Sequence, residues 1–396
     1  MARPELGSVL PPLILGTATF NTQYHPDPEQ MPYTDIVRRA LQHNITAFDT
    51  SPYYGPSETL LGQALSTIAP SRGDLFLITK AGRIASDDFD YSPAWIRYSV
   101  CRSLERLRTS YLDLVYAHDV EFVSPEEVLE AVRELRRLRD RGIVRYVGIS
   151  GYPLDVLASL AEMILSETGE PLDAILSYAN YTVQNDRLGQ EQHLKRFGAA
   201  RVGCLLNASI LGMGLLTTRG IDKGPMASWH PAPPELRTRC SDLAVMAEAD
   251  GERLEEIAIR WALKNWASVG APFGTRVPPS GPCLSSTASA GDESSPRIGV
   301  SVMGVSAVTE LEETWKVWKS VMGSATAADN EDASRQEGIA RLVDEVMRPS
   351  LESWRNYAWK SGGNSFINSR AIKGIVPKDD GIAERGGINL SAAAIG

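Results

Sequence analysis

Short apolar runs recur along this chain, separated by longer segments in which apolar residues return every three or four positions. Such runs are typical of buried β-strands, and the longer spacing is typical of helices with one buried face. The pattern predicts strands at residues 13–15, 45–48, 75–79, 112–117, 142–150, 172–178, 202–207 and 298–304, and helices that include 34–43, 57–65, 93–107, 125–141 and 153–167. Eight alternating strand and helix units predict an α/β fold of the (β/α)8, or TIM-barrel, type.

Two segments exceed what a barrel needs. Residues 270–297 are rich in Ser, Pro and Gly and poor in bulky apolar residues, so we expect a long flexible insertion before the eighth strand. Apolar residues at helical spacing after residue 339 predict a C-terminal helical extension packed on the barrel. We therefore expect one barrel domain over residues 1–360 and a mobile tail over residues 361–396.

Composition narrows the classes of partner. The 396-residue chain carries a formal net charge of -9 with no basic stripe, which argues against binding to nucleic acid. It contains no apolar run long enough to span a bilayer, and the first twenty residues do not resemble a signal peptide. Its four cysteines lack the spacing of a zinc site or disulfide framework. We expect a cytoplasmic protein without a metal, either a monomer or a weak homodimer.

Four titratable side chains lie at or just beyond the ends of three successive predicted strands: Asp49, Tyr54, Lys80 and His118. Each residue alone also has a structural interpretation: Asp49 as a turn former, Tyr54 as an edge of the core, Lys80 as an exposed cation and His118 as a buried imidazole. In a parallel barrel, however, the carboxyl ends of the strands meet at the active-site mouth. Together, the four residues predict one catalytic site.

The chemistry of this set suits proton transfer. A phenol has an ordinary pKa of about 10 and needs neighbours that ease proton gain and loss. An ammonium beside Tyr54 would favour phenolate, the carboxylate of Asp49 would hold Lys80 charged, and His118 could donate to a carbonyl or alkoxide oxygen. Since no side chain carries hydride, a redox reaction here implies a nicotinamide cofactor.

The residues around this set resemble an aldo-keto reductase from about Leu13 to about Trp318. The resemblance rests on Phe-Asp-Thr-Ser-Pro-Tyr-Tyr-Gly at 48–55, Ser-Glu-Thr-Leu-Leu-Gly at 57–62, Ile-Thr-Lys at 78–80, Tyr-Leu-Asp-Leu-Val-Tyr-Ala-His at 111–118 and Gly-Ile-Val-Arg-Tyr-Val-Gly-Ile-Ser at 142–150. In that family a tetrad of Asp, Tyr, Lys and His occurs in this order. The resemblance therefore implies catalytic roles for the same four residues.

The resemblance also implies where a cofactor binds, because this family holds the nucleotide across strand ends and loops rather than on a Gly-rich dinucleotide motif. It implies a carboxamide-binding serine at the end of the fifth strand, a loop after the seventh strand that approaches the pyrophosphate, and a segment after the eighth strand that holds the adenosine. The cofactor residues so assigned are Gly16, Thr17, Ser150, Ser177, Asn207, Ser209, Leu211, Gly214, Gly304, Ser306, Glu310, Glu313 and Thr314.

Charge in the last of these segments favours NAD over NADP. Family members that take a 2′-phosphate commonly carry Arg or Lys there, whereas this chain has Ser306, Glu310 and Glu313 and no cation before Lys316. A carboxylate near the ribose accepts from free hydroxyls and repels a phosphate. An acidic helix start stabilised by the helix dipole is an equally good interpretation of each glutamate alone, and NADP stays possible.

Two departures from the common family pattern sharpen the substrate class. Ala208 and Ser177 stand where an aromatic residue and a glutamine are frequent, and both variants resemble the sugar dehydrogenase branch, which includes L-galactose and D-arabinose 1-dehydrogenases. We expect an NAD-dependent enzyme that oxidises a free aldose to its lactone. From position alone, the loops after strands 1 and 4 offer substrate contacts at Phe20, Asn21, Asp119 and Phe122. The alternatives are an NADPH-dependent aldehyde or ketone reductase and a non-catalytic nucleotide-sensing subunit.

Overall fold

Eight parallel strands close into a barrel in the computed structural model, which describes residues 3–277, 295–322, 329–363 and 366–377. Around the barrel the strands follow the order β1, β10, β7, β6, β5, β4, β3, β2. Their bounds are Leu13–Gly16 (β1), Ala47–Asp49 (β2), Phe76–Ala81 (β3), Leu112–His118 (β4), Val144–Gly151 (β5), Ala174–Tyr178 (β6), Cys204–Ala208 (β7) and Val300–Gly304 (β10). The predicted barrel is confirmed.

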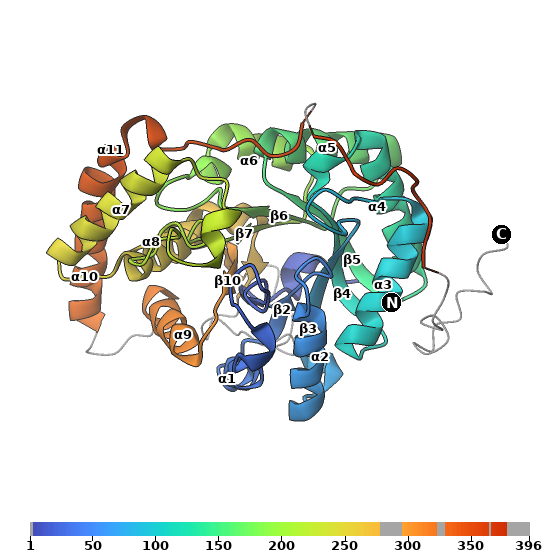
Figure 1. Cartoon of the computed structure of the whole chain (residues 1–396), viewed down its shortest axis with the longest axis horizontal. Helices are drawn as coiled ribbons and strands as arrows, with labels where there is room; N and C mark the ends of the chain where they lie inside the picture. Colours follow the sequence, from blue (N-terminus) through green and yellow to red (C-terminus); the bar gives the residue numbers. More distant parts are fainter. Residues whose placement is uncertain (1–2, 278–294, 323–328, 364–365, 378–396) are drawn as a thin grey trace.

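Helices form an outer layer around these strands (Figure 1). Their starts follow the sequence: Ser92 and Ser124 cap helices whose first residues are Pro93 and Pro125, and Ser124 completes a capping box with Glu127. Among the described helices, none combines the length and hydrophobicity needed to cross a membrane. The helices that alternate with the strands are Tyr33–Gln42 (α1), Ser57–Ile68 (α2), Pro93–Leu107 (α3), Pro125–Asp140 (α4), Leu154–Thr168 (α5), Glu191–Ala199 (α6), Pro234–Ala249 (α7), Leu254–Val269 (α8) and Val308–Met322 (α9).

Successive side chains along each strand point alternately into two hydrophobic cores, one inside the barrel and one between the strands and the helices. In β4, Leu114 and Tyr116 belong to the cluster inside the barrel, whereas Val115 and Ala117 belong to the cluster beneath the helices. This division follows from the two-residue period of a strand. Leu10 adds to the inner cluster from the chain before β1. Because both faces of the strands are occupied by packing, polar groups are concentrated at the strand ends.

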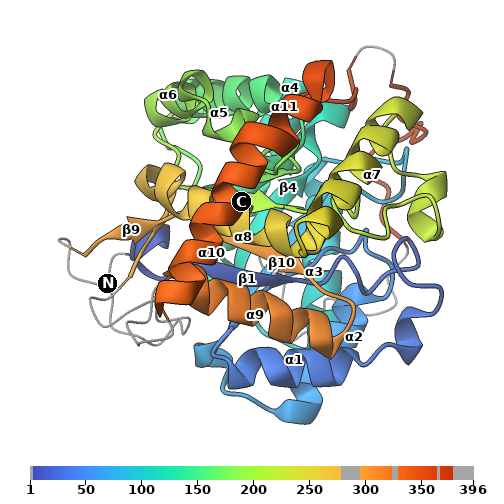
Figure 2. The same cartoon turned by 90° about the vertical axis from the view of Figure 1, so that its left-hand side faces the viewer.

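The C-terminal extension is helical, as predicted. It consists of α10 (Asp329–Arg341), one π-helical turn (Leu342–Met347) and α11 (Arg348–Ser350). Figure 2 shows α10 lying across α8. The residues at helical spacing on its inner side are buried, namely Ile339, Val343, Met347 and Leu351.

Beyond α11, residues 358–363 and 366–374, which we call the strap, run along the outside of the barrel past α6, α5 and α4 toward α3 (Figure 1). Phe366 packs on Phe89 with ring centroids 5.5 Å apart. Asn368 exchanges hydrogen bonds with both the N–H and the carbonyl of Phe89, at 3.1 and 2.8 Å. Arg370 pairs with the buried Asp90 at 2.8 Å. The strap is therefore fastened by specific polar contacts.

The mobile tail stays a prediction. Residues 361–363 and 366–374 nevertheless make side-chain hydrogen bonds and ion pairs to distant parts of the chain, which apolar periodicity does not reveal. Residues 378–396 lie outside the described residues, and the tail prediction is not tested there.

The predicted insertion begins and ends in a small antiparallel pair of strands. Thr275–Arg276 (β8) pairs with Arg297–Ile298 (β9). Residues 278–294, which make up most of the expected insertion, lie outside the described residues.

Candidate active site

The four titratable residues singled out in the sequence come together at one rim of the barrel. Asp49 ends β2, Lys80 stands one residue before the end of β3, and His118 ends β4. Tyr54 lies in the turn between β2 and α2. The three strands are neighbours in register, so their carboxyl ends share this rim.

A buried ion pair joins Lys80 to Asp49. Lys80 Nζ donates hydrogen bonds to Asp49 Oδ1 at 2.6 Å and to the carbonyl of Thr50 at 2.9 Å. Burial raises the pKa of Asp49, although Lys80 acts to lower it. Lys80 Nζ also lies 4.9 Å from the ring centroid of Tyr54. Because a positive charge beside a phenol favours phenolate, the Lys80 ammonium can ease proton loss from Tyr54.

Tyr54 packs edge-on against His118, with ring centroids 5.8 Å apart and planes at 89°. Burial, followed by the charges of Asp49 and Asp119, raises the pKa of Tyr54 well above its ordinary value, while Arg83 acts to lower it. The phenol is therefore protonated at neutral pH. It can donate a proton directly, but to accept one it must first lose its own.

The imidazole of His118 is neutral. Burial lowers the pKa of His118 to about 3, although Asp119 acts to raise it. Ser51 Oγ lies 3.1 Å from His118 Nδ1 and accepts a hydrogen bond from the Tyr53 N–H at 3.1 Å. Since that hydroxyl already accepts from Tyr53, its own proton can point to Nδ1, which leaves the ring hydrogen on Nε2. His118 can then act as a neutral hydrogen-bond donor.

A second ion pair, Arg83 with Asp119, lies beside His118. Asp119 Oδ2 contacts the Arg83 guanidinium and lies 3.6 Å from His118 Nε2. Arg83 also stacks over the Tyr53 ring at 3.8 Å and donates to its hydroxyl at 3.0 Å. Burial acts to raise the pKa of Asp119, but the charge and hydrogen bond of Arg83 oppose it, and the pKa falls below its ordinary value. Asp119 is therefore an ionised carboxylate at the rim.

The residues assigned to the nicotinamide end of a cofactor lie on three adjacent strands. Ser150, Ser177 and Asn207 each stand one residue before the end of β5, β6 and β7, and Ser177 is paired with Asn207. Asn207 Nδ2 donates to the carbonyl of Tyr181 at 3.0 Å, whereas its buried Oδ1 has no hydrogen-bond partner among the described residues. A buried acceptor left unpaired is costly. This oxygen fits the amide hydrogens of a nicotinamide carboxamide.

The loop after β7 bends sharply where the pyrophosphate is expected. Ser209 and Met213 have φ of 54° and 56°, and Gly214 has φ of 93°. A Cβ at Gly214 would lie 2.6 Å from Met226 Sδ, so only glycine fits there without a shift of neighbouring atoms. Leu211, which was also assigned to this loop, is half-buried against the outer core. Left-handed residues in a short loop are typical of backbone that binds anions.

Gly16 and Gly304, assigned to the cofactor rim, are partners at the ends of β1 and β10. Thr17 follows Gly16 and is fully buried. Its hydroxyl donates to the carbonyl of Asp49 at 3.1 Å and lies 2.7 Å from Ser57 Oγ. Thr17 thus ties the tetrad strand β2 to β1.

The start of α9 carries the residues assigned to the adenosine end. The N–H and hydroxyl of Ser306 donate to Glu310 Oε2 at 2.6 and 3.0 Å, so Glu310 caps the helix. Thr314 is buried. Glu313 pairs at 2.9 Å with Arg253, which immediately precedes α8. A cation therefore does reach this segment, from a part of the chain that spacing along the sequence does not connect to it.

The four substrate candidates fall in different environments. Phe20 is fully buried against Tyr33, with ring centroids 6.4 Å apart, and supports the rim from within the core. Asn21 is also buried. Phe122 stacks on Phe89 and packs edge-on against Phe366 of the strap. Asp119 is the candidate that contacts the tetrad, through His118.

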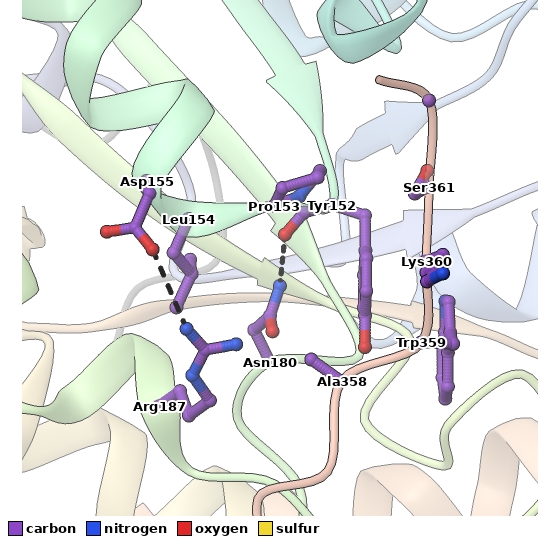
Figure 3. Close-up of a pocket in the computed structure, with 11 residues that line it drawn as sticks. Tyr152, Pro153, Leu154, Asp155, Asn180, Arg187, Ala358, Trp359, Lys360 and Ser361 are labelled. Atoms are coloured by element: carbon purple, nitrogen blue, oxygen red, sulfur yellow. Dashed lines mark hydrogen bonds and ion pairs between the residues drawn. The ribbon is translucent and has the colours of Figure 1, made fainter. Parts of the chain in front are cut away.

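A cavity of 280 Å³ lies between the strap and the loops after β5 and β6 (Figure 3). Tyr152 and Trp359 stack nearly parallel, with ring centroids 4.7 Å apart, and Asn180 Nδ2 donates to the carbonyl of Tyr152 at 2.7 Å. The tetrad does not line this cavity. Its lining consists of Tyr152, Pro153, Leu154, Asp155, Asn180, Arg187, Ala358, Trp359, Lys360, Ser361 and Gly362.

Sequence reasoning missed Ser51 and Arg83. Both lie close to motif residues, Ser51 two positions after Asp49 and Arg83 three positions after Lys80. A polar residue so near a strand end was the available signal. Gly82 marks the turn that leads to Arg83: its φ is 104°, and a Cβ there would lie 2.5 Å from the Tyr91 ring.

Several known proteins are similar to this chain in sequence. Residues 12–332 match the Aldo/keto reductase family. The D-arabinose 1-dehydrogenase of Saccharomyces cerevisiae is 37% identical over 363 residues, which cover 90% of this chain and 95% of the relative. The L-galactose dehydrogenase of Arabidopsis thaliana is 36% identical over 233 residues, which cover 58% of this chain and 69% of that enzyme.

Among solved structures, the glycerol dehydrogenase of Gluconobacter oxydans aligns with a TM-score of 0.54. The alignment covers 87% of this chain and 95% of that one, at 20% sequence identity. At this identity the likeness concerns the fold alone.

Proposed function

The chain belongs to the aldo/keto reductase family, and we propose that it is an NAD-dependent aldose dehydrogenase that oxidises the anomeric hydroxyl of a free pentose or hexose to a lactone. The observation that carries the proposal is the buried Lys80–Asp49 pair at 2.6 Å, beside the rings of Tyr54 and His118. This arrangement suits proton transfer at a carbinol oxygen. The relatives named for D-arabinose and L-galactose support a free aldose as substrate.

In this reaction Tyr54 accepts the proton of the anomeric hydroxyl. Its raised pKa means that the phenol must first be deprotonated, and the nearby Lys80 ammonium stabilises the phenolate. Asp49 keeps that ammonium charged and in place. Neutral His118 donates a hydrogen bond from Nε2 to the sugar oxygen and so orients it. The bound nicotinamide cofactor supplies the hydride acceptor.

Residues on the rim would hold that cofactor. The unpaired Oδ1 of Asn207 would accept from the carboxamide, with Ser150 and Ser177 on the neighbouring strands. The bent loop from Ser209 to Gly214 would approach the pyrophosphate. The N-terminus of α9, at Ser306, would hold the adenosine portion.

The charges at α9 support NAD. The Glu310 carboxylate stands at the helix start, where it would repel a 2′-phosphate and accept from free ribose hydroxyls. Two cations from elsewhere in the chain reach this segment, because Arg39 pairs with Glu312 and Arg253 pairs with Glu313. Arg253 lies within 4 Å of three glutamates, Glu255, Glu256 and Glu313. Its charge is therefore largely neutralised.

Arg253 is also the observation that favours a second candidate, an NADPH-dependent reductase of aldehydes or ketones using the same tetrad in the opposite direction. Its side chain is 47% exposed. If Arg253 exchanged Glu313 for a 2′-phosphate, it would supply the cation that such members commonly carry.

Initial rates of nicotinamide reduction by the purified protein test the proposal. D-arabinose, L-fucose, L-galactose, D-xylose and simple alcohols should each be offered with NAD and with NADP. Turnover of a sugar with NAD supports the proposal. Aldehyde reduction with NADPH alone contradicts both its direction and its cofactor, and cofactor binding without any turnover favours a nucleotide-sensing subunit.

The Tyr54→Phe variant tests the mechanism. We expect its turnover to fall by about 10²–10⁴-fold while cofactor binding, followed by fluorescence titration, is retained. Tyr111→Phe is the matched control, since Tyr111 precedes β4 at the opposite end from the tetrad. Full activity of Tyr54→Phe would refute the role.

A further inference from the structure

We propose that Asp119, held in place by Arg83, recognises the hydroxyl on the carbon next to the reacting anomeric carbon and thereby selects 2-hydroxylated aldoses. The inference rests on the proposed function and deepens it. Asp119 was a substrate candidate from its position after β4, and Arg83 is its ion-pair partner.

The first argument is the cost of placing two charges here. The side chains of Arg83 and Asp119 are only 15% and 5% exposed. A buried ion pair loses hydration that its mutual attraction often fails to recover, so an apolar pair of the same size would hold the fold as well or better. Charges retained at such a position, 3.6 Å from a residue of the tetrad, point to a role in recognition.

The second argument is that the ion pair leaves one carboxylate oxygen of Asp119 free to accept a hydrogen bond. An ionised carboxylate has two oxygens that together can accept about four hydrogen bonds. Arg83 occupies Oδ2, whereas Oδ1 accepts no hydrogen bond from any residue in the described part of the chain. The other two guanidinium nitrogens of Arg83 also donate hydrogen bonds, Nη2 to the Tyr53 hydroxyl at 3.0 Å and Nε to the Ala85 carbonyl at 3.3 Å. The pair therefore presents an acceptor, which a sugar hydroxyl fits as a donor.

The third argument is distance from the reacting atoms. His118 Nε2, which would hold the anomeric oxygen, lies 3.6 Å from Asp119 Oδ2. Oxygens on adjacent carbons of a sugar are separated by a similar span of roughly 3 Å, the scale of one hydrogen-bond length. An oxygen on His118 thus places its vicinal neighbour within reach of Asp119. The backbone of Asp119 has φ of 57°, a left-handed conformation that turns the chain at this rim.

The experiment compares each oxidised sugar with its 2-deoxy counterpart, for example D-arabinose with 2-deoxy-D-ribose, in wild type and in Asp119→Asn. The measured quantity is the ratio of the two kcat/KM values, because a general loss of activity cancels in it. We expect wild type to prefer the 2-hydroxylated sugar and Asp119→Asn to reduce that preference at least about tenfold, since a weakened acceptor discriminates less.

Two further variants test whether the change in sugar preference comes from the Arg83–Asp119 pair. The double variant Arg83→Met/Asp119→Leu removes the pair without leaving a buried charge unpaired, and it should lose the same preference. Glu191→Gln is the matched control, because it removes a carboxylate that is 80% exposed on α6. Its preference should equal that of wild type.

An equal loss for both sugars in Asp119→Asn, or no change in the ratio, would overturn the inference. Such a result with normal sugar turnover in wild type leaves the proposed function intact. If wild type oxidises no sugar but reduces aldehydes, the proposed function fails and the inference is tested by the same ratio for glyceraldehyde over propanal. An unchanged ratio for that pair in Asp119→Asn would also overturn it.

Discussion

Ser51 Oγ lies 3.1 Å from Nδ1 of His118. Both side chains are buried, and Ser51 also accepts the Tyr53 N–H at 3.1 Å, so the hydroxyl is fixed in position. A serine in this arrangement sets which imidazole nitrogen carries the hydrogen. The nitrogen that faces the rim, Nε2, is then the donor.

Ser51→Ala should release this control. We expect kcat to fall about tenfold with little change in KM, because the wrong tautomer of His118 no longer donates to the substrate oxygen. The ¹⁵N shifts of the His118 ring report the tautomer directly. Ser103→Ala is the control, since it removes another buried hydroxyl, on α3, that has no partner among the described residues. Unaltered ring shifts in Ser51→Ala would contradict this role.

The Lys80–Asp49 pair allows catalysis to be separated from stability. Lys80→Met leaves the Asp49 carboxylate buried and unpaired, so urea unfolding should show a loss of about 3–5 kcal/mol together with loss of turnover. Adding Asp49→Leu removes the unpaired charge and should restore most of the stability but none of the activity. Recovered turnover in the double variant would show that Lys80 has no part in proton transfer.

Glu121 makes stability depend on pH. It is buried, its Oε1 accepts from the strap hydroxyl of Ser361 at 2.7 Å and from the Tyr152 N–H at 3.1 Å, and its Oε2 has no partner in the described part of the chain. Burial, and then the charge of Asp119, raises the pKa of Glu121 from 4.5 to about 8. The unfolded chain therefore loses this proton at lower pH than the folded protein does.

The sign of the effect follows by linkage. Below pH about 4.5 both states are protonated, and as pH rises toward about 8 the folded state alone keeps the proton, so the free energy of unfolding falls across this window. Glu121→Gln, which mimics the protonated acid, should match wild type at the acid end and exceed its stability by a few kcal/mol at the alkaline end. A constant difference in urea unfolding across these pH values would contradict the assignment.

The strap should contribute to stability. A chain that ends at Lys360 exposes Phe89, which is otherwise fully buried, and removes Arg370 from the buried Asp90. We expect a loss of at least about 2 kcal/mol in urea unfolding, from one exposed aromatic ring and one unpaired carboxylate. A chain that ends at Pro377 keeps every strap contact described and is the control. Equal stability of the two truncated chains would show that the strap is only loosely held.

Glu310 should govern the choice of cofactor. Glu310→Lys replaces the carboxylate at the start of α9 with a cation, so the ratio of kcat/KM for NADP over NAD should rise at least about tenfold. Glu312→Lys makes the same charge change on the same helix, where Glu312 instead pairs with Arg39 of α1 and with His43, which follows α1. It should leave the ratio unchanged. A similar rise in both variants would indicate a general effect of helix charge.

The sequence predicted the barrel and the meeting of the tetrad because both depend on local information. The two-residue period of β4 separates Leu114 from Val115, and the end of the strand places His118 at the rim. Once a parallel barrel is inferred, residues at the ends of neighbouring strands must converge. The sequence also predicted helix starts, such as the one at Pro125 after Ser124.

Contacts between distant residues were decided only by the tertiary structure. Arg370 and Asp90 lie 280 positions apart and Arg253 and Glu313 lie 60 apart, so no periodicity connects either pair. Burial, which sets the pKa of Glu121, likewise depends on what the rest of the chain packs around it. The amino-acid sequence by itself thus determined the barrel and the rim at which the four titratable residues meet, whereas the folded chain decided which charges are paired, which acceptors are left open, and how the strap is held.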